Sequence, residues 1–277
     1  MDADVTVGAV VMRSIVGDTD ANLACISSFV DRAARGNVDI LCFPELCLTG
    51  YSVSPRIQDE ALTMDSPAVA SLVDLARRTG ICILAGFVER ERGAVYATHL
   101  AVSKDGILGA YRKLHLGPPE HAIFSPGNDI AVFQTHGTRF GVQLCYDAHF
   151  PELSTLYAVK GADILFMPHA SPNGTSESKL ESWLRHLTAR AYDNGVFVLA
   201  CNQRGDNGWG LHFPGLAVIL SPDGKVMAQS GNDEDSLTTA TLRRADLEGV
   251  RGHRMRYFLP HRRPELYAEL TDRKKTS

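Results

Sequence analysis

The same order of short apolar strands and helical segments occurs twice along this chain, and this repeat constrains the fold more than any other feature. The matching fragments are separated by 124, 115 and 118 residues, which is too long for a solenoid repeat. The third pair of fragments contains the dipeptide Asp-Gly in both copies, which is typical of the turn in a β-hairpin. Two similar halves are therefore expected, at roughly residues 5–112 and 139–229. The matching pairs are DILCFP (39–44) with DILFMP (163–168), GICILAG (80–86) with GVFVLAC (195–201), and AVSKDGILG (101–109) with AVILSPDGKV (217–226).

Each half alternates strands with helices. Residues 5–12 form an uncharged, β-branched run typical of a strand buried on both faces. Helical spacing follows up to Gly36, a second buried strand is expected at 38–43, and a second helix at about 68–78. Two β-α-β-α-β-β halves can pack their sheets face to face with the helices outside. We expect an α/β fold, a four-layer α-β-β-α sandwich, in a single domain spanning 1–277 because no linker composition divides the halves.

Composition excludes several classes of protein. The chain has 28 Lys+Arg and 32 Asp+Glu in 277 residues, a net charge of −4, which argues against a nucleic-acid partner. Apolar runs such as 196–201 are far shorter than the roughly 20 residues of a membrane helix. The start of the chain is acidic, unlike a signal peptide, and six cysteines are too few for a disulfide scaffold. We expect a cytoplasmic enzyme or small-molecule binder that does not associate with membranes.

Three reactive residues fall at the predicted ends of strands, the edge where sites form in α/β sheets. Glu45 follows the strand 38–43, Lys113 follows the second strand of the hairpin, and Cys145 is expected to close a strand at 140–145. Each has an ordinary structural explanation: a capping carboxylate, a solvated lysine and a small buried thiol. The remaining cysteines are interpreted as reduced core residues, namely Cys25, Cys42, Cys47, Cys82 and Cys201.

Taken together, these three residue types can perform covalent catalysis. A thiol, whose free pKa is about 8.5, needs a base or a cation beside it to act as a nucleophile near neutral pH. A carboxylate can take its proton and later return it, and a fixed ammonium can stabilise an oxyanion. Glu45, Lys113 and Cys145 therefore form a candidate set of base, electrostatic stabiliser and nucleophile.

The segments around these residues resemble those of the nitrilase, or carbon-nitrogen hydrolase, superfamily. Around Glu45 stands LCFPELCLTGY, around Lys113 stands YRKLHLGPPEHAIFSPGN, and around Cys145 stands GVQLCYDAHFPEL. All three are similar to family motifs and occur in the family's order. The resemblance extends from about residue 5 to 242, and it implies the same α-β-β-α sandwich.

The resemblance also implies a mechanism without metal or cofactor. Cys145 would attack an amide carbonyl and form a thioester, with Glu45 as the base. Lys113 and the backbone N–H of Tyr146 would hold the oxyanion. Glu120 matches a second family glutamate that positions Lys113 and the substrate, although a solvated loop carboxylate is the alternative interpretation.

Other residues suggest the substrate. The pair Tyr146-Asp147 resembles amidases and carbamoyl-amide hydrolases, whereas true nitrilases usually carry Trp-Glu there. His149 stands where hydrolases of dicarboxylic acid monoamides usually have Arg, so a clamp on a free α-carboxylate is in doubt, and a structural role for His149 is the alternative. By the repeat, His169 occupies the strand end that corresponds to Glu45. Tyr51, which closes the loop after Glu45, is a weaker candidate for the pocket.

The favoured function is a cysteine hydrolase that releases ammonia from a small linear amide or N-carbamoyl compound. Three alternatives stay open: a nitrilase, a soluble acyltransferase that uses the same thioester, and a non-catalytic protein that keeps the fold. The basic and aromatic tail at 251–277 is expected to make contacts in a homodimer or higher homo-oligomer.

Overall fold

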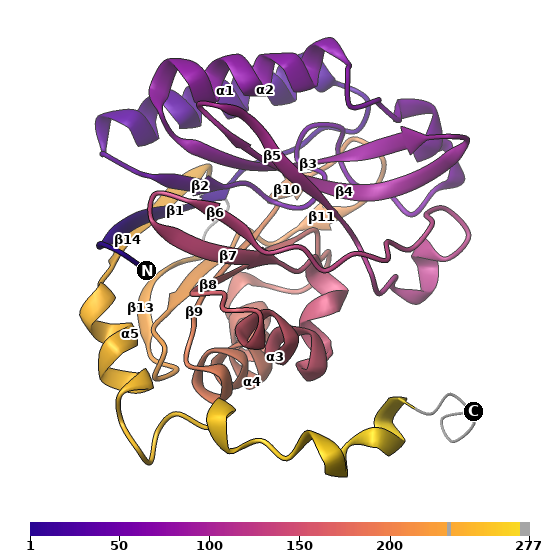
Figure 1. Cartoon of the computed structure of the whole chain (residues 1–277). Helices are drawn as coiled ribbons and strands as arrows, with labels where there is room; N and C mark the ends of the chain where they lie inside the picture. Colours follow the sequence, from indigo (N-terminus) through magenta and orange to yellow (C-terminus); the bar gives the residue numbers. More distant parts are fainter. Residues whose placement is uncertain (232–233, 272–277) are drawn as a thin grey trace.

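Two six-stranded sheets pack face to face, with helices on both outer faces (Figure 1). The computed structural model describes residues 1–231 and 234–271. The first sheet has the order β14-β1-β2-β3-β4-β5 and the second has the order β13-β12-β9-β8-β7-β6. The predicted four-layer α-β-β-α sandwich is confirmed.

The strands of the first sheet are β1 (Val5–Val11), β2 (Ile40–Cys42), β3 (Cys82–Glu91), β4 (Ala94–Ser103), β5 (Gly106–Arg112) and β14 (Ser236–Leu242). Those of the second are β6 (Phe133–Thr135), β7 (Thr138–Val142), β8 (Ile164–His169), β9 (Phe197–Asn202), β12 (Ala217–Leu220) and β13 (Val226–Ser230). A separate small hairpin comprises β10 (Gly205–Asp206) and β11 (His212–Phe213). The α-helices are α1 (Thr19–Arg35), α2 (Pro67–Thr79), α3 (Pro151–Val159), α4 (Ser176–Asn194) and α5 (Arg244–Arg251).

The two halves have the predicted topology. In the first, β1, β2 and β3 are parallel and α1 and α2 connect them; in the second, β7, β8 and β9 are parallel and α3 and α4 connect them. An antiparallel hairpin follows each parallel set. Each sheet gains one further edge strand: β6 pairs with β7, and β14 returns from the end of the second half to pair with β1. The repeat did not predict these two edge strands.

The first helix illustrates why the sequence folds as it does. The side chain of Asp18 accepts from Ala21 N–H and caps the N-terminus, and Gly36 follows the last residue. Ile26 and Val30, one turn apart, are buried against the first sheet. Burying a side chain of this size stabilises the fold by about 1.5–3 kcal/mol. The predicted helix between Asp18 and Gly36 is confirmed.

The core between the sheets contains most of the cysteines predicted to be buried. Cys42 on β2 and Cys201 on β9 meet across the sandwich, with their Sγ atoms 4.0 Å apart. Cys25 is the exception, because its side chain on α1 is partly exposed and donates to Asp235. The prediction that Cys25 is a core residue was wrong, since it lies at the rim of the helix–sheet interface.

The carboxyl ends of the parallel strands from both sheets meet at one edge of the sandwich. Glu45, just after β2, donates its backbone N–H to the carbonyl of His169, the last residue of β8. The repeat predicted that these two residues occupy corresponding strand ends. The edge at which they meet contains the candidate active site.

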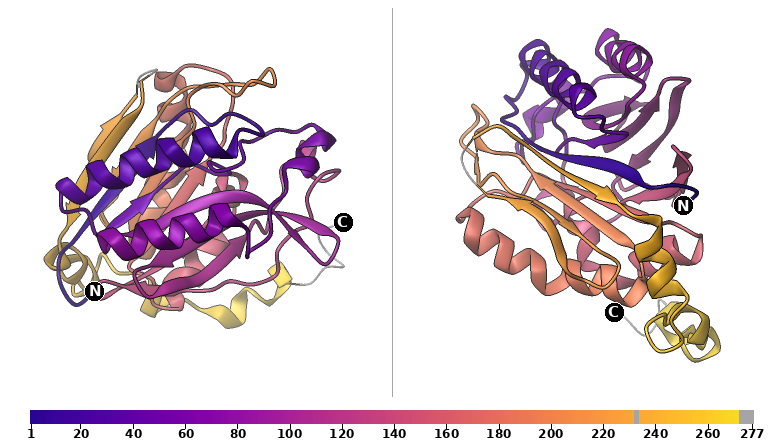
Figure 2. Two further views of the ribbon diagram at one scale, coloured as in Figure 1. Left: turned by 90° about the horizontal axis from the view of Figure 1, so that it is seen from above. Right: turned by 90° about the vertical axis from the view of Figure 1, so that its left-hand side faces the viewer.

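The segment after α5 leaves the sandwich as a succession of short turns (Figure 2). These are η4 (Leu259–His261), η5 (Pro264–Leu266) and η6 (Ala268–Thr271). Most of its side chains up to 269 are exposed, and Met255 is 75% exposed. Within 1–231 and 234–271, no helix combines the length and hydrophobicity that crossing a bilayer requires.

Candidate active site

Cys145 begins a short 3-10 turn, η3 (Cys145–His149), after β7. The sequence predicted that it closes a strand, but β7 ends at Val142 and the backbone of Cys145 has a φ of +41°. The Asp147 carboxylate accepts the Leu144 N–H at 2.9 Å and draws the chain out of the extended conformation. A non-glycine residue at positive φ costs about 1–3 kcal/mol and is found mostly at functional sites. This turn leaves Cys145 as a residue partly exposed at the strand edge.

Glu45 lies in a tight turn after β2. The Cys47 N–H donates to the Pro44 carbonyl at 3.2 Å, so that Glu45 and Leu46 are the corner residues, and Leu46 has a φ of +52°. The Glu45 carboxylate is fully buried, and its Oε2 accepts from the Ala170 N–H at 3.1 Å. The turn therefore directs a carboxylate inward between the two sheets.

Lys113 joins two buried carboxylates. Its Nζ lies 2.8 Å from Glu45 Oε1 and 2.7 Å from Glu120 Oε1, and all three side chains are nearly inaccessible to solvent. Glu120 also accepts from Tyr51 OH at 2.9 Å and from the Gly117 N–H at 2.6 Å. Glu120 is thus a buried partner of Lys113, and the interpretation of a solvated loop carboxylate is wrong.

Burial and the neighbouring charges shift the pKa values of Glu45, Lys113 and the Cys145 thiol. Burial raises the pKa of Glu45 to about 7, with Lys113 lowering it and Glu120 raising it. Burial lowers the pKa of Lys113, but the two glutamates more than compensate and hold it well above its usual value. Burial and the charge of Glu45 raise the pKa of the Cys145 thiol to about 12, against a lowering by Lys113. Near neutral pH the thiol is therefore protonated, and the lysine is charged.

Asp147 organises the turn that begins at Cys145. Its Oδ2 accepts from Tyr111 OH at 2.8 Å, and its Oδ1 accepts from the His115 backbone N–H at 2.8 Å. The His115 ring, whose Nδ1 lies 2.9 Å from the same oxygen, stacks on Phe150 with ring centroids 3.7 Å apart. Because Asp147 is fully buried, these bonds fix the turn against both sheets.

The structure places the four predicted substrate-binding residues around this cluster. Tyr51 is buried beside Glu120, and Tyr146 is partly exposed immediately after the thiol. His149 is exposed at the end of the turn, with its ring 5.7 Å from that of Tyr146. His169 is buried, with its ring centroid 4.1 Å from that of Trp183 and the two rings tilted by 35°, and burial lowers its pKa to about 3.

Sequence reasoning missed two contributors from the second half. The Ala170 N–H donates to Glu45 Oε2 at 3.1 Å, so the backbone that follows β8 holds the Glu45 carboxylate. Gln203 is fully buried and donates from Nε2 to the Glu45 carbonyl at 2.7 Å. Position after a strand could have identified both, because they directly follow β8 and β9 at the same edge.

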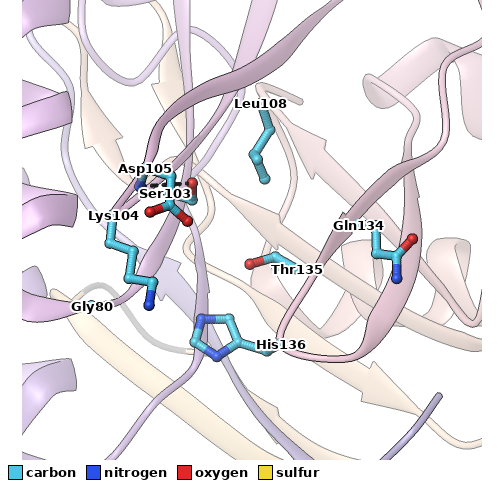
Figure 3. Close-up of a pocket in the computed structure, with 8 residues that line it drawn as sticks. All are labelled: Gly80, Ser103, Lys104, Asp105, Leu108, Gln134, Thr135 and His136. Atoms are coloured by element: carbon cyan, nitrogen blue, oxygen red, sulfur yellow. Dashed lines mark hydrogen bonds between the residues drawn. The ribbon is translucent and has the colours of Figure 1, made fainter.

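Two hollows flank different parts of the molecule. A groove of about 390 Å³ lies beside the candidate nucleophile, with Tyr146, Phe150 and His115 in its lining. Another, of about 520 Å³, lies between the β4–β5 and β6–β7 hairpins, where Lys104 and His136 point into it (Figure 3). Gly80 in its lining precedes β3, so this second groove is at the opposite end of the sheet from Glu45.

The fold and the site together define a class of protein, the α-β-β-α sandwich enzymes that hydrolyse carbon–nitrogen bonds. Residues 6–252 match the family model for carbon-nitrogen hydrolases. The chain therefore belongs to the carbon-nitrogen hydrolase family. This is the family that its sequence motifs resemble.

Relatives in the family have different activities. The chain is 30% identical over 257 residues to an (R)-stereoselective amidase of Pseudomonas sp, covering 92% of this chain and 90% of that protein. It is also 30% identical over 261 residues to a nitrilase of Pyrococcus abyssi, covering 91% and 93%. The family and an enzymatic activity on carbon–nitrogen bonds follow from these matches, whereas the substrate does not.

A solved structure of the family is similar throughout. A variant of the amidase from Nesterenkonia sp. AN1 superposes with a TM-score of 0.82 at 26% identity, covering 97% of each chain. In that structure the acetamide moiety of fluoroacetamide is covalently added at the active-site cysteine.

Proposed function

We propose that this enzyme hydrolyses a small linear amide or N-carbamoyl compound through a thioester on Cys145 and releases ammonia. The observation that carries the proposal is the buried cluster in which Lys113 Nζ lies 2.8 Å from Glu45 and 2.7 Å from Glu120. Burial raises the pKa of the Cys145 thiol, and the charges of Glu45 and Lys113 shift it further, in opposite directions. This electrostatic link supports the assignment of Glu45 as the base and Lys113 as the cation that serve the cysteine.

The first step forms a bond between Cys145 Sγ and the carbonyl carbon. Because the pKa of the thiol is raised to about 12, the thiolate forms only as its proton moves to Glu45. Glu45, with its pKa raised to about 7, accepts that proton while the S–C bond forms, because transfer from the free thiol beforehand is unfavourable.

The developing oxyanion needs donors that are already in place. An ammonium has three N–H donors, and Lys113 directs two of them at Glu45 and Glu120. The third donor, together with the backbone N–H of Tyr146, is available for the oxyanion. Collapse of the intermediate breaks the C–N bond, and Glu45 returns its proton to the departing ammonia.

Hydrolysis of the thioester completes the cycle. Glu45 takes a proton from water, the hydroxide oxygen adds to the thioester carbon, and the C–S bond breaks. Cys145 leaves as a thiolate and regains its proton from Glu45. The carboxylic acid product then dissociates as its anion.

The pair Tyr146-Asp147 favours an amide substrate over a nitrile, because it resembles the pair found in amidases. Nitrile hydrolysis by the same cluster is the second candidate, and the nitrilase among the relatives supports it. A soluble acyltransferase would pass the same thioester to an amine instead of water. Ammonia release from matched amide and nitrile panels, with and without hydroxylamine, separates the three activities.

The decisive experiment traps the intermediate. The pure protein is mixed with a library of small amides and analysed by intact mass, with peptide mapping to locate the added acyl group on Cys145. Cys145→Ala should abolish trapping and lower ammonia release at least about 1000-fold. Cys25→Ala is the matched control and should retain both, and full ammonia release by Cys145→Ala would overturn the nucleophile assignment.

The proposal includes a single domain spanning 1–277 and a homo-oligomer formed in part by the tail. Phe258 of the tail packs on Tyr192 of α4 with ring centroids 5.6 Å apart, yet 40% and 44% of these two side chains stay exposed. Met255, in the same segment, is 75% exposed. Exposed apolar surface of this kind is typical of a protein contact. A cytoplasmic location and the absence of nucleic-acid and membrane partners stay predictions from the sequence.

A further inference from the structure

The small hairpin β10–β11 belongs to the second half of the chain but contacts the first half. It lies between β9 and β12 in the sequence. Gln203, which precedes it, donates from Nε2 to the Glu45 carbonyl at 2.7 Å. Asn207, in its turn, donates from Nδ2 to the Tyr51 carbonyl at 2.8 Å. Two side-chain amides of the second half therefore hold both ends of the segment 45–51, which begins with the candidate base.

Every polar group of Asn207 has a partner. Its Oδ1 accepts from the N–H groups of Trp209 and Leu211 at 2.8 and 3.0 Å, which closes the turn of the hairpin. Its backbone N–H donates to the Leu211 carbonyl, and its carbonyl accepts from the Val16 N–H, both at 3.0 Å. Asn207 is 1% exposed, and a buried amide whose hydrogen bonds are all formed is held rigidly. The Nδ2 that binds the Tyr51 carbonyl is thus fixed in place.

The hairpin holds the ring of Tyr51 as well as its backbone. Phe213 of β11 is fully buried and meets the Tyr51 ring edge to face, with the centroids 6.2 Å apart. Aromatic pairs of this geometry contribute about 0.5–1.5 kcal/mol beyond the burial of their area. The Arg56 guanidinium, five residues after Tyr51, lies 5.0 Å from the ring centroid of Trp209. The segment around Tyr51 is therefore held through a hydrogen bond, a ring pair and a cation–π contact.

Tyr51 connects the hairpin to the buried lysine. Its OH donates to Glu120 Oε1 at 2.9 Å, the same oxygen that lies 2.7 Å from Lys113 Nζ. Glu120 Oε2 accepts from the Gly117 N–H at 2.6 Å. Both oxygens of Glu120 thus have donors besides the lysine, so the carboxylate keeps one orientation. This orientation holds the ammonium between Glu120 and Glu45.

From this series of contacts we infer that Asn207 is a positioning residue of the reaction, because it holds the tyrosine whose hydroxyl orients Glu120. The inference rests on the proposed function, in which Lys113 stabilises the oxyanion. Without the Tyr51 bond, Glu120 is free to turn, and Lys113 shifts toward Glu45. The ammonium then lies away from the position where the oxyanion forms. Since this charge develops only in the transition state, the loss falls on kcat and not on KM.

The first variant removes the hydroxyl alone. Tyr51→Phe keeps the ring against Phe213 and every backbone contact of the segment. We expect kcat to fall about 10- to 100-fold, the effect of losing one hydrogen bond to a charged group, with KM changed less than about threefold. Ammonia release from butyramide, or from the amide that the wild-type enzyme hydrolyses fastest in the panel, measures both constants.

The second variant separates Asn207 from Tyr51. Asn207→Asp keeps the oxygen that closes the turn and replaces the donor to the Tyr51 carbonyl with a second oxygen. We expect kcat to fall about tenfold. If Asn207 acts through the Tyr51 hydroxyl, the double variant with Tyr51→Phe should have a kcat within about threefold of Tyr51→Phe alone, because the bond to Glu120 is already lost. Substitutions that only weaken the fold would instead multiply their losses.

Asn194→Asp is the matched control. Asn194 ends α4, is 2% exposed and donates from Nδ2 to the Arg190 carbonyl at 2.9 Å. The same substitution therefore removes the same kind of buried bond, but at the end of β9 opposite to Gln203. We expect both Asn→Asp variants to melt at a lower temperature than the wild type, and only Asn207→Asp to lose kcat.

Three results would overturn the inference. They are a wild-type kcat in Tyr51→Phe, multiplied losses in the double variant, and a loss of kcat in Asn194→Asp equal to that in Asn207→Asp. If Asn207→Asp fails to fold, Phe213→Leu, which removes the ring pair, takes its place in the same double-variant comparison. If the wild type releases no ammonia from any amide and forms no thioester on Cys145, the proposed function itself fails, and this outcome is distinct from the other three.

Discussion

At the scale of single residues, Glu45 determines how activity should depend on pH. Its pKa is raised to about 7, chiefly by burial, and only the ionised carboxylate can take the thiol proton. We expect kcat/KM to fall as pH decreases below about 7. A pH–rate profile with a neutral amide measures this limb, and activity that stays constant down to pH 5 would contradict the assignment of Glu45 as the base.

The raised pKa of Glu45 also predicts how the free energy of unfolding depends on pH. A carboxyl whose pKa is higher in the folded than in the unfolded state binds more protons when folded, so the folded state loses stability as pH rises between the two values. For Glu45 this interval runs from about 4.5, its ordinary value, to about 7. The loss is complete above pH 7.

Glu45→Gln removes this titration, while keeping most of the shape of the side chain. We therefore expect the free energy of unfolding of Glu45→Gln, relative to wild type, to increase as pH rises from 4.5 to 7. Chemical denaturation at several pH values measures the difference. A relative stability that stays constant or falls over this range would show that burial does not dominate the ionisation of Glu45.

At the scale of elements, the turn that carries Glu45 depends on a glycine in β3. A Cβ added at Gly86 would lie 2.5 Å from Leu46 N and 2.8 Å from His99 Nδ1. Leu46 is already held at positive φ, and His99 is fully buried, so neither has room to move aside. Only a residue without a side chain lets the turn lie this close to the sheet.

Gly86→Ala should therefore displace the turn and lower kcat/KM about 100-fold, the effect of a misplacement of about 1 Å in a catalytic group. Amide hydrolysis and thermal melting measure the consequences. Gly249→Ala is the control, because a Cβ there meets nothing within 4 Å, and in α5 it should stabilise the protein by about 0.5–1 kcal/mol. Wild-type activity in Gly86→Ala would show that the turn adapts.

The elements also show how far sequence reasoning reaches. Long periodic segments such as α1 and the hairpin strands were predicted correctly, because their apolar spacing is repeated over several turns or residues. The turn at Cys145 was not, since one residue at positive φ interrupts an apolar run that otherwise is typical of a strand. The edge strands β6 and β14 escaped prediction because both lie outside the two repeated stretches at 5–112 and 139–229.

At the scale of the whole molecule, the repeat explains why residues far apart in sequence form one site. Corresponding aspartates precede β2 and β8: Asp39 accepts the Thr6 N–H at 2.8 Å, and Asp163 accepts the Arg139 N–H at 3.3 Å. At the other end of the same strands the halves differ, with Glu45 in one and His169 in the other. The shared scaffold is repeated, whereas the reactive groups are not.

This asymmetry sets the limit of what the sequence could indicate about the site. Glu45 and Lys113 could be identified as side chains at strand ends of the first half. Ala170 contributes through its backbone N–H, which no residue type encodes, so its bond to Glu45 could be found only in the structure.

The tail belongs to the same scale, because several apolar side chains of its described part stay exposed to solvent. Met255 and Leu266 are 75% and 60% exposed, and Phe258 covers Tyr192 of α4 only in part.

Removal of residues 253–277 leaves α5 intact, including the ion pair between Arg251 and Asp163 at 2.7 Å. We expect this truncation to lower the molar mass in solution from that of an oligomer to that of one chain, as measured by sedimentation equilibrium. Met255→Ser with Leu266→Ser should weaken the association without shortening the chain. An unchanged mass in both variants would mean that the tail does not hold the oligomer together.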